Sequence, residues 1–181
     1  MRYTDKEYMM KNEPVSVYLG LGSNIGDRHK NLQRALEILR QRMKILEQSS
    51  IYDTEPMGNP HQPRFLNMVV QLETYLEPDK LLALLKGIET KMGRVIPSQP
   101  GSPRPIDLDI LLYGERIWNS PALTIPHPEL AARAFVLVPL NEIAPGRVHP
   151  VTKKTVRKML KELNSGVQGI LKFQEDSDKF V

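Results

Sequence analysis

Apolar and polar residues alternate most clearly in the stretch from Ile106 to Tyr113. Side chains along a β-strand point to opposite faces in turn, so this pattern predicts a strand that carries Asp107 and Asp109 on one face. At a rise of about 3.3 Å per residue, the backbones of the two aspartates lie roughly 6.6 Å apart. The opposite face is expected to be wholly aliphatic, with Ile106, Leu108, Ile110 and Leu112.

Two periodicities predict the remaining elements. Alternating apolar residues indicate strands, whereas apolar residues three or four positions apart indicate amphipathic helices. Proline or glycine at the edge of a pattern limits an element. The predicted elements are a strand at 15–21, a helix at 28–44, a less regular strand at 45–52, a strand at 66–74, a helix at 78–92, a short hairpin-like piece through Trp118 and a basic helix at 152–164.

The order of these elements predicts an α+β domain with a ferredoxin-like βαββαβ antiparallel sheet. Helices are expected on one face of the sheet and the ligand site on the other. Because Asn67 alternates with apolar neighbours, it is expected on the same open face as the two aspartates. Prolines concentrated between residues 56 and 150 predict long ordered ligand-binding loops. We expect a polar N-terminal extension at 1–13, a single domain at 14–164 and an accessory C-terminal tail at 165–181.

Composition narrows the class of protein. With 181 residues, of which 40% are hydrophobic, the chain is long enough for one domain with a real core. The absence of cysteine excludes disulfides and thiolate metal sites. No apolar run approaches the ~20 residues of a membrane span, and the first residues lack the apolar core of a signal peptide. We therefore expect a soluble cytoplasmic protein. A net charge of +4 suits nucleic acid or a small polyanion such as ATP.

The aspartate pair predicts a magnesium site. Two carboxylates at this spacing can bracket a pair of hard cations about 4 Å apart. Magnesium is usually held by one or two carboxylates together with water and substrate phosphates. Arg104 lies between Pro103 and Pro105 on a rigid lead-in to the strand, and a cation at this position suits a polyphosphate. The alternative is a solvated strand face with two ordinary aspartates.

Two other stretches could hold ligands. The first strand ends in G-L-G-S-N-I-G-D, which contains neither a P-loop nor a dinucleotide-binding fingerprint. From the pattern alone, it indicates a tight strand-to-helix turn. Residues 53–67, D-T-E-P-M-G-N-P-H-Q-P-R-F-L-N, indicate a structured loop of the kind that often carries function.

Four blocks of the sequence together resemble one enzyme family. R-P-I-D-L-D-I-L-L at 104–112 is similar to the signature of the 6-hydroxymethyl-7,8-dihydropterin pyrophosphokinases of folate biosynthesis. G-S-N at 22–24 resembles their opening motif, and the segment at 54–67 resembles T-x-P-x-G followed by (Y/F)-L-N. P-H-P-x-L-x-x-R-x-F-V-L-x-P-L-x-E-I-A-P at 126–145 is similar to a further family block. The resemblance covers roughly residues 15–150.

The resemblance implies a reaction and its participants. The enzyme would transfer diphosphate from ATP to the hydroxymethyl oxygen of 6-hydroxymethyl-7,8-dihydropterin, releasing AMP. ATP would be the co-substrate, two Mg²⁺ ions would be the cofactor, and the chain would act as a monomer without nucleic acid or membrane. The implied catalytic residues are Arg94, Arg104, Asp107, Asp109 and Arg133, with Asp107 and Asp109 holding the metal. The implied pterin-binding residues are Gly22, Thr54, Met57, Phe65, Asn67 and Phe135. The implied ATP-binding residues are Glu89, Arg104, Ile110, Thr124 and His127.

The sequence also departs from the family pattern. The loop at 94–105 has Ile96 and Gly101 where an arginine and an aromatic residue are common. A basic ribose contact is replaced by Ala122, and the tyrosine that often follows the histidine is Pro128. These departures leave open a non-catalytic family member that binds pterin or nucleotide. A ferredoxin-like nucleic-acid-binding module is a further alternative, although the aromatic-rich strand that such modules use is absent.

Overall fold

Strand β1 (Val15–Ser23) lies inside an antiparallel sheet, between β4 (Phe65–Thr74) and β5 (Asp107–Tyr113). The sheet has six strands in the order β5-β1-β4-β3-β8, and β2 also pairs with β4. In this computed structural model, β2 spans Lys44–Gln48, β3 spans Tyr52–Thr54 and β8 spans Ile170–Lys172. A separate hairpin consists of β6 (Trp118–Ser120) and β7 (Leu123–Ile125). The structure describes residues 13–56, 61–94, 102–163 and 169–174.

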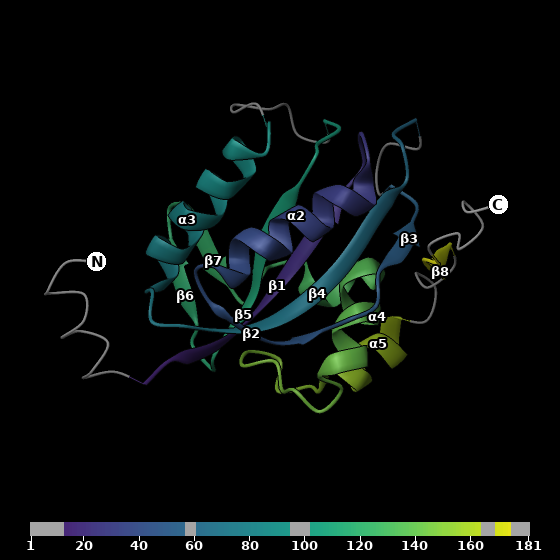
Figure 1. Cartoon of the computed structure of the whole chain (residues 1–181). Helices are drawn as coiled ribbons and strands as arrows, with labels where there is room; N and C mark the ends of the chain where they lie inside the picture. The colour runs from purple at the N-terminus through teal and green to yellow at the C-terminus, as the bar shows by residue number, and fades with distance from the viewer. Residues whose placement is uncertain (1–12, 57–60, 95–101, 164–168, 175–181) are drawn as a thin grey trace, which may run out of the picture.

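Helices cover both faces of the sheet, and each face has its own apolar cluster (Figure 1). On the first face, α2 (Arg28–Arg40) and α3 (Pro78–Lys91) bury Leu32 and Leu85 against alternate residues of the central strands. On the second face, α4 (Ala134–Ile143) and α5 (Val156–Leu163) bury Leu137 and Met159. A three-residue 3₁₀ turn, η1 (Leu130–Ala132), precedes α4.

The predicted fold class is confirmed. The predicted helices at 28–44 and 78–92 are present, although α2 ends at Arg40. The side chain of Asp27 caps α2 by accepting the N–H of Lys30 at 3.0 Å, and Pro78 occupies the first turn of α3. Among the described residues, no helix combines the length and apolar character that crossing a membrane requires.

The single strand predicted at 45–52 is instead two strands. Ser49 interrupts the ladder: its backbone N–H donates to the carbonyl of Val69 at 2.9 Å, and its hydroxyl accepts the N–H of Val69 at 3.0 Å. A side chain therefore replaces the backbone carbonyl that would continue the strand. The chain bends here, so that β2 pairs with the second half of β4 and β3 pairs with its first residues.

The face predicted for Leu112 is wrong. The register between β1 and β5 shifts, so that Tyr18 lies opposite Leu112 but Leu19 lies opposite Ile110. Leu111 is the extra residue of this bulge, and it reverses the alternation that follows. Leu112 consequently packs on the second face, while Tyr113 joins the first-face core. Ile106, Leu108 and Ile110 lie on the first face as predicted.

The sequence prediction had no counterpart for β7 and η1, nor for two elements that extend the domain further along the chain. One is α4, whose sequence A-F-V-L-V-P-L-N-E-I contains an internal proline and little polar periodicity. The other is β8, which pairs with β3 and so places part of the expected accessory tail in the sheet. On the second face, α4 and α5 therefore cover only part of the sheet. The limits of the domain and of the N-terminal extension stay predictions.

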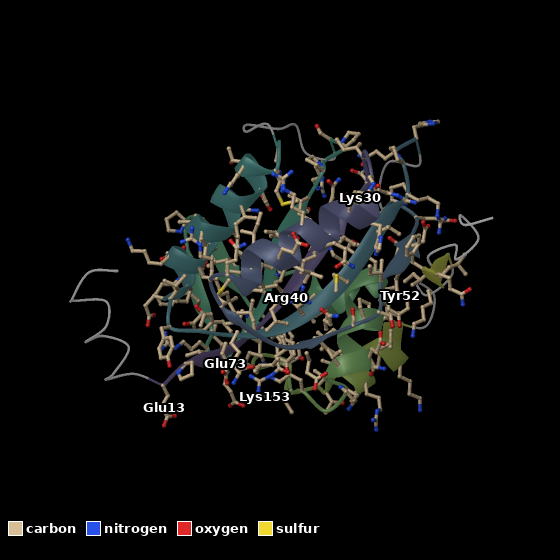
Figure 2. All side chains as sticks on the ribbon, in the orientation of Figure 1. Glu13, Lys30, Arg40, Tyr52, Glu73 and Lys153 are labelled. Atoms are coloured by element: carbon tan, nitrogen blue, oxygen red, sulfur yellow. The ribbon has the colours of Figure 1, made fainter. Side chains whose placement is uncertain are left out.

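Glu142 on α4 connects this helix to β3. Its carboxylate accepts hydrogen bonds from the N–H and hydroxyl of Ser50, at 3.0 and 2.8 Å, and from the hydroxyl of Tyr52 at 3.0 Å. Tyr52, which is labelled in Figure 2, extends from β3 toward this helix. Burial alone would raise the pKa of Glu142, but the hydrogen bonds outweigh it and hold the pKa below its ordinary value. Burial and this hydrogen bond raise the pKa of Tyr52 to about 12.

We predict that Glu142→Gln lowers the free energy of unfolding at pH 7 by about 0.5–1 kcal/mol, because these partially exposed bonds lose their charged acceptor. The folded-state pKa is depressed, so the contribution is complete above the ordinary glutamate pKa of about 4.3 and is lost as pH falls through the folded-state pKa. Urea denaturation between pH 3 and 7 measures the difference. Exposed Glu37→Gln is the control for charge. A destabilisation of Glu142→Gln that stayed constant down to pH 3 would contradict the prediction.

Candidate active site

Two glycines of β1 create an open trough on the second face of the sheet. Gly22 lies directly between Asn67 on β4 and Asp107 on β5, and Gly20 lies between Val69 and Asp109. Strands are about 4.8 Å apart, so side chains on β4 and β5 stand roughly 10 Å from each other with no side chain between them. Interpreting these glycines as a tight strand-to-helix turn is thus wrong, because both lie inside β1.

A cavity of about 400 Å³ occupies this trough; we call it the first cavity. It contains every described residue of the predicted pterin set. Within it, the amide of Asn67 donates to the hydroxyl of Thr54 at 2.7 Å, and both residues are buried. Met57, which was also predicted, lies outside the described residues. The predicted site residues that line this cavity are Gly22, Thr54, Phe65, Asn67, Arg104, Asp107, Asp109, Arg133 and Phe135.

Each aromatic ring of the first cavity has an arginine beside it. The guanidinium carbon of Arg104 lies 5.3 Å from the ring centre of Phe65, and that of Arg133 lies 5.6 Å from the ring centre of Phe135. Asn24 fixes the backbone of Arg104, accepting its N–H at 2.7 Å and donating to its carbonyl at 3.2 Å. Arg133 is ion-paired with Glu129. The cavity therefore combines two apolar surfaces with two cations.

The two aspartates have opposite electrostatic environments. Burial would raise the pKa of Asp107, but Arg104 and Arg94 outweigh it and hold the pKa below its ordinary value. The relevant contacts are 2.8 Å to Nε of Arg104 and 2.5 Å to Nη1 of Arg94. Burial and the neighbouring charge of Asp107 raise the pKa of Asp109. The described residues thus compensate the negative charge of Asp109 less well than that of Asp107.

A second cavity, of about 340 Å³, lies on the other side of Asp109. Three residues of the predicted ATP set, Ile110, Thr124 and His127, line it, as do the family departures Ala122 and Pro128. Asp109 lines both cavities. The described residues of the predicted pterin set therefore line the first cavity, and three residues of the predicted ATP set line the adjacent second cavity. Two residues of the predicted ATP set differ: Arg104 lines the first cavity, and Glu89 lines neither.

His127 and Lys86 define the polar wall of the second cavity. Nδ1 of His127 accepts the N–H of Glu129 at 3.2 Å, so the neutral ring carries its proton on Nε2. Burial lowers the pKa of His127. Sequence reasoning missed Lys86, which lines this cavity and lies 2.9 Å from Oε1 of Glu89. Its position one helical turn before Glu89 was the available signal.

Glu89 is completely buried between α3 and β5, with 0% of its surface exposed. Oε1 accepts the backbone N–H of Leu108 at 2.7 Å, and Oε2 lies 2.9 Å from Nη1 of Arg94. Burial raises its pKa, against the opposing effects of Lys86, Leu108 and Arg94. Arg94, predicted to be catalytic, reaches the site through Asp107. The loop residues Ile96 and Gly101 lie outside the described residues.

The aspartate pair meets the requirements of magnesium. Among the described residues, no group of three or more histidine, aspartate or glutamate side chains could hold a metal ion alone. A magnesium site here would depend on two protein carboxylates, with water and substrate phosphates completing the shell, which is the arrangement magnesium favours. The raised pKa of Asp109 fits a residue whose charge a cation would compensate. The pair therefore offers the ligand type of the predicted metal, with the oxygens of Asp107 in contact with Arg94 and Arg104 in this structure.

Comparison with known proteins agrees with this geometry. The model of the 7,8-dihydro-6-hydroxymethylpterin-pyrophosphokinase (HPPK) family matches residues 18–145. The chain belongs to the HPPK family. The 2-amino-4-hydroxy-6-hydroxymethyldihydropteridine pyrophosphokinase of Aquifex aeolicus is 40% identical over 148 residues, which are 82% of this chain and 92% of the relative. The folic acid synthesis protein fol1 of Schizosaccharomyces pombe is 43% identical over 166 residues, which are 91% of this chain.

The relatives differ in how much of their length this chain spans. It covers only 22% of fol1 from Schizosaccharomyces pombe and 22% of fol1 from Pneumocystis carinii. Among solved structures, wild-type HPPK-DHPS of Plasmodium falciparum superposes with a TM-score of 0.69 at 17% identity, covering 89% of this chain and 44% of that one. At that identity, the superposition supports the fold alone.

We predict that Gly22→Ala destabilises the protein by about 1–2 kcal/mol, whereas Gly20→Ala does not. A methyl group at Gly22 would lie 2.7 Å from Oδ1 of Asn67 and would displace that buried amide from Thr54. At Gly20 the nearest atom is 3.5 Å away, an ordinary contact with Leu111. Urea denaturation measures both variants. Equal stability of the two would mean that Asn67 is not held in the conformation described.

Proposed function

We propose that this protein transfers the diphosphate group of ATP to the hydroxymethyl oxygen of 6-hydroxymethyl-7,8-dihydropterin, giving AMP and the pterin diphosphate in folate biosynthesis. One observation carries the proposal: the cavity with the predicted pterin residues and the cavity with predicted ATP residues meet at Asp109. Membership of the HPPK family supports the same reaction. Diphosphate transfer requires two substrates to meet at one set of phosphate-binding charges, and this is the arrangement around Asp109.

The first cavity suits a flat, polar-edged ring. Phe65 and Phe135 offer apolar ring faces, and aromatic stacking adds about 0.5–1.5 kcal/mol to the burial of such a ligand. The amide of Asn67 offers both a donor and an acceptor, of which one N–H is used by Thr54. We propose that Phe65 and Phe135 hold the pterin ring, while Asn67 and Thr54 bind its polar edge above Gly22. We also propose that Met57 contributes to pterin binding, as the family resemblance implies.

The second cavity suits the nucleotide. Thr124 and the chain at Ile110 would contact adenosine, while His127 and Lys86 face the side of Asp109 where the triphosphate would lie. Ala122 offers no charge to the ribose, so Lys86 is the cation that this wall supplies among the described residues. Arg104 and Arg133 approach from the first cavity and would neutralise the transferred phosphates.

We propose that two Mg²⁺ ions bind at Asp107 and Asp109. When bound, they would neutralise the phosphates and favour ionisation of the attacking hydroxyl. The residues of the chain position the reactants. The pterin hydroxymethyl oxygen loses its proton to solvent and attacks the β-phosphorus, the bond from that phosphorus to the oxygen bridging it to the α-phosphorus breaks, and AMP leaves with that oxygen. No protein nucleophile takes part, so catalysis rests on orientation and on charge supplied by Arg94, Arg104 and Arg133.

The first test is AMP formation from ATP, the pterin and Mg²⁺. We predict that Asp109→Asn lowers the rate by at least about 100-fold, the scale of removing one electrostatic stabiliser from an active site. Asp27→Asn is the matched control, because Asn also caps α2 and the residue lies away from both cavities. Formation of ADP instead of AMP would refute the proposed reaction. Ligand binding without AMP would instead indicate the non-catalytic alternative, for which Ala122 and Pro128 are the motivation.

A paired test addresses the assignment of the cavities. We predict that Phe135→Leu weakens pterin binding roughly 2- to 10-fold, from the loss of stacking, and leaves nucleotide affinity unchanged. Thr124→Val is predicted to do the reverse, because it removes a hydroxyl only from the second cavity. Calorimetric titration with each ligand, using a non-hydrolysable ATP analogue, measures both. If Phe135→Leu impaired the nucleotide and Thr124→Val the pterin, the two assignments would have to be exchanged.

Other expectations also enter as proposals. We propose that the chain acts as a monomer. We also propose that it is located in the cytoplasm, with which its cysteine-free composition is consistent. Sedimentation velocity at micromolar concentration tests the oligomeric state. A nucleic-acid-binding role is not favoured, because the aromatic-rich strand that such modules use is absent from the sequence. In addition, Asp107 and Asp109 on the open part of the second face would repel a phosphate backbone when no metal is bound.

A further inference from the structure

The carboxyl group of Glu89 is buried and lines neither cavity, so it needs an explanation of its own. It is the acidic side chain that is fully buried among the described residues, and its neighbours on α3, Leu85 and Ile88, are apolar core residues. Removing a carboxylate from water is strongly unfavourable unless its partners compensate. An apolar residue would fill this space at lower cost, so packing alone does not account for a glutamate.

The partners of Glu89 all belong to the surroundings of the aspartate pair. Leu108, whose N–H it accepts at 2.7 Å, is the residue between Asp107 and Asp109. Arg94, at 2.9 Å, is also 2.5 Å from Asp107. Lys86, at 2.9 Å, lines the second cavity beside Asp109. One buried carboxylate thus contacts three groups that each adjoin an aspartate or the nucleotide cavity.

The contact with Leu108 has a specific structural reason. β5 is the last strand at its end of the sheet, so no strand among the described residues lies along its outer edge. The N–H of Leu108 is on that edge in a residue with 0% exposure, where an unsatisfied donor would destabilise the fold. Oε1 of Glu89 takes the place of the missing strand carbonyl. Glu89 therefore fixes the backbone of β5 between the two aspartates.

We infer that Glu89 is a positioning residue, which orients Asp107 and Asp109 through Leu108 and keeps Arg94 on Asp107 without touching either substrate. The inference rests on the proposed function and gives Glu89 an indirect role in place of the direct ATP contact predicted from sequence. Partners that orient metal-binding side chains typically change metal affinity or activity by about 10- to 100-fold when they are lost. The same scale is expected here.

The test compares Glu89→Gln with the wild type and with Glu142→Gln. The amide oxygen of Gln can still accept from Leu108, but it cannot neutralise Arg94 or Lys86. We expect about a 10-fold lower kcat and weaker Mn²⁺ binding in the presence of α,β-methylene-ATP, with pterin KM within twofold. The amide proton of Leu108 is expected to shift upfield in the NMR spectrum, because its acceptor loses charge. Glu142→Gln is expected to lose stability without any of these changes.

A second variant removes the acceptor of Leu108 as well. Glu89→Met has a similar volume but leaves Arg94, Lys86 and the N–H of Leu108 without this partner, so a larger loss of stability than in Glu89→Gln is expected, and urea denaturation establishes that each variant is folded before binding is measured. Its loss of metal affinity should exceed that of Gln. If Gln, or Met in its place, keeps kcat and Mn²⁺ affinity within twofold of wild type, the role is purely structural and the inference is overturned. If the wild type makes no AMP but Mn²⁺ binding still depends on Glu89, the positioning role stands and the proposed reaction fails.

Discussion

The site depends on a gap in the middle of the sheet. Gly20 and Gly22 leave β1 without side chains of its own between β4 and β5, so Asn67 can lie over Gly22 and Leu111 over Gly20, and the first cavity opens beside them. The limit is steric: a single methyl at Gly22 would meet the Asn67 amide at 2.7 Å. Asn67, Asp107 and Asp109 can then face a common ligand although they belong to strands that are not neighbours. A flat sheet interior is thereby converted into a binding surface.

The acidic side chains at that surface lie in different electrostatic environments, which suit them to different roles. Asp107 is held ionised by Arg94 and Arg104, so it is available as a fixed anion at neutral pH. Asp109 has a raised pKa and adjoins both cavities, so it is the carboxylate that gains most from a cation. Glu89, on the far side of β5, adds a third acid that never reaches solvent. The three acids therefore differ in environment although two of them lie on one strand.

The rest of the second face is closed by segments from distant parts of the chain. α4 brings Phe135 to the cavity wall, with Arg133 at its N-terminus. Ser49 interrupts the strand after β2, which allows β3 to pair with the start of β4 and places Thr54 beside Asn67. The C-terminal β8 then extends the sheet from β3. Each of these contacts joins residues that are more than ten positions apart in the sequence.

The sequence by itself determined the helices α2 and α3, the inward apolar faces and the alternation that presents Asp107 and Asp109 together, because these follow from local periodicity and capping. Its motifs also divided most of the predicted pterin and ATP residues into the two sets that line the two cavities, with Arg104 and Glu89 as exceptions. Only the tertiary structure decided the bulge at Leu111, the break at Ser49 and the burial of Glu89 against Leu108. These depend on hydrogen-bond register between distant strands and on which backbone groups an edge strand leaves unpaired, and neither leaves a mark on local hydrophobic patterning.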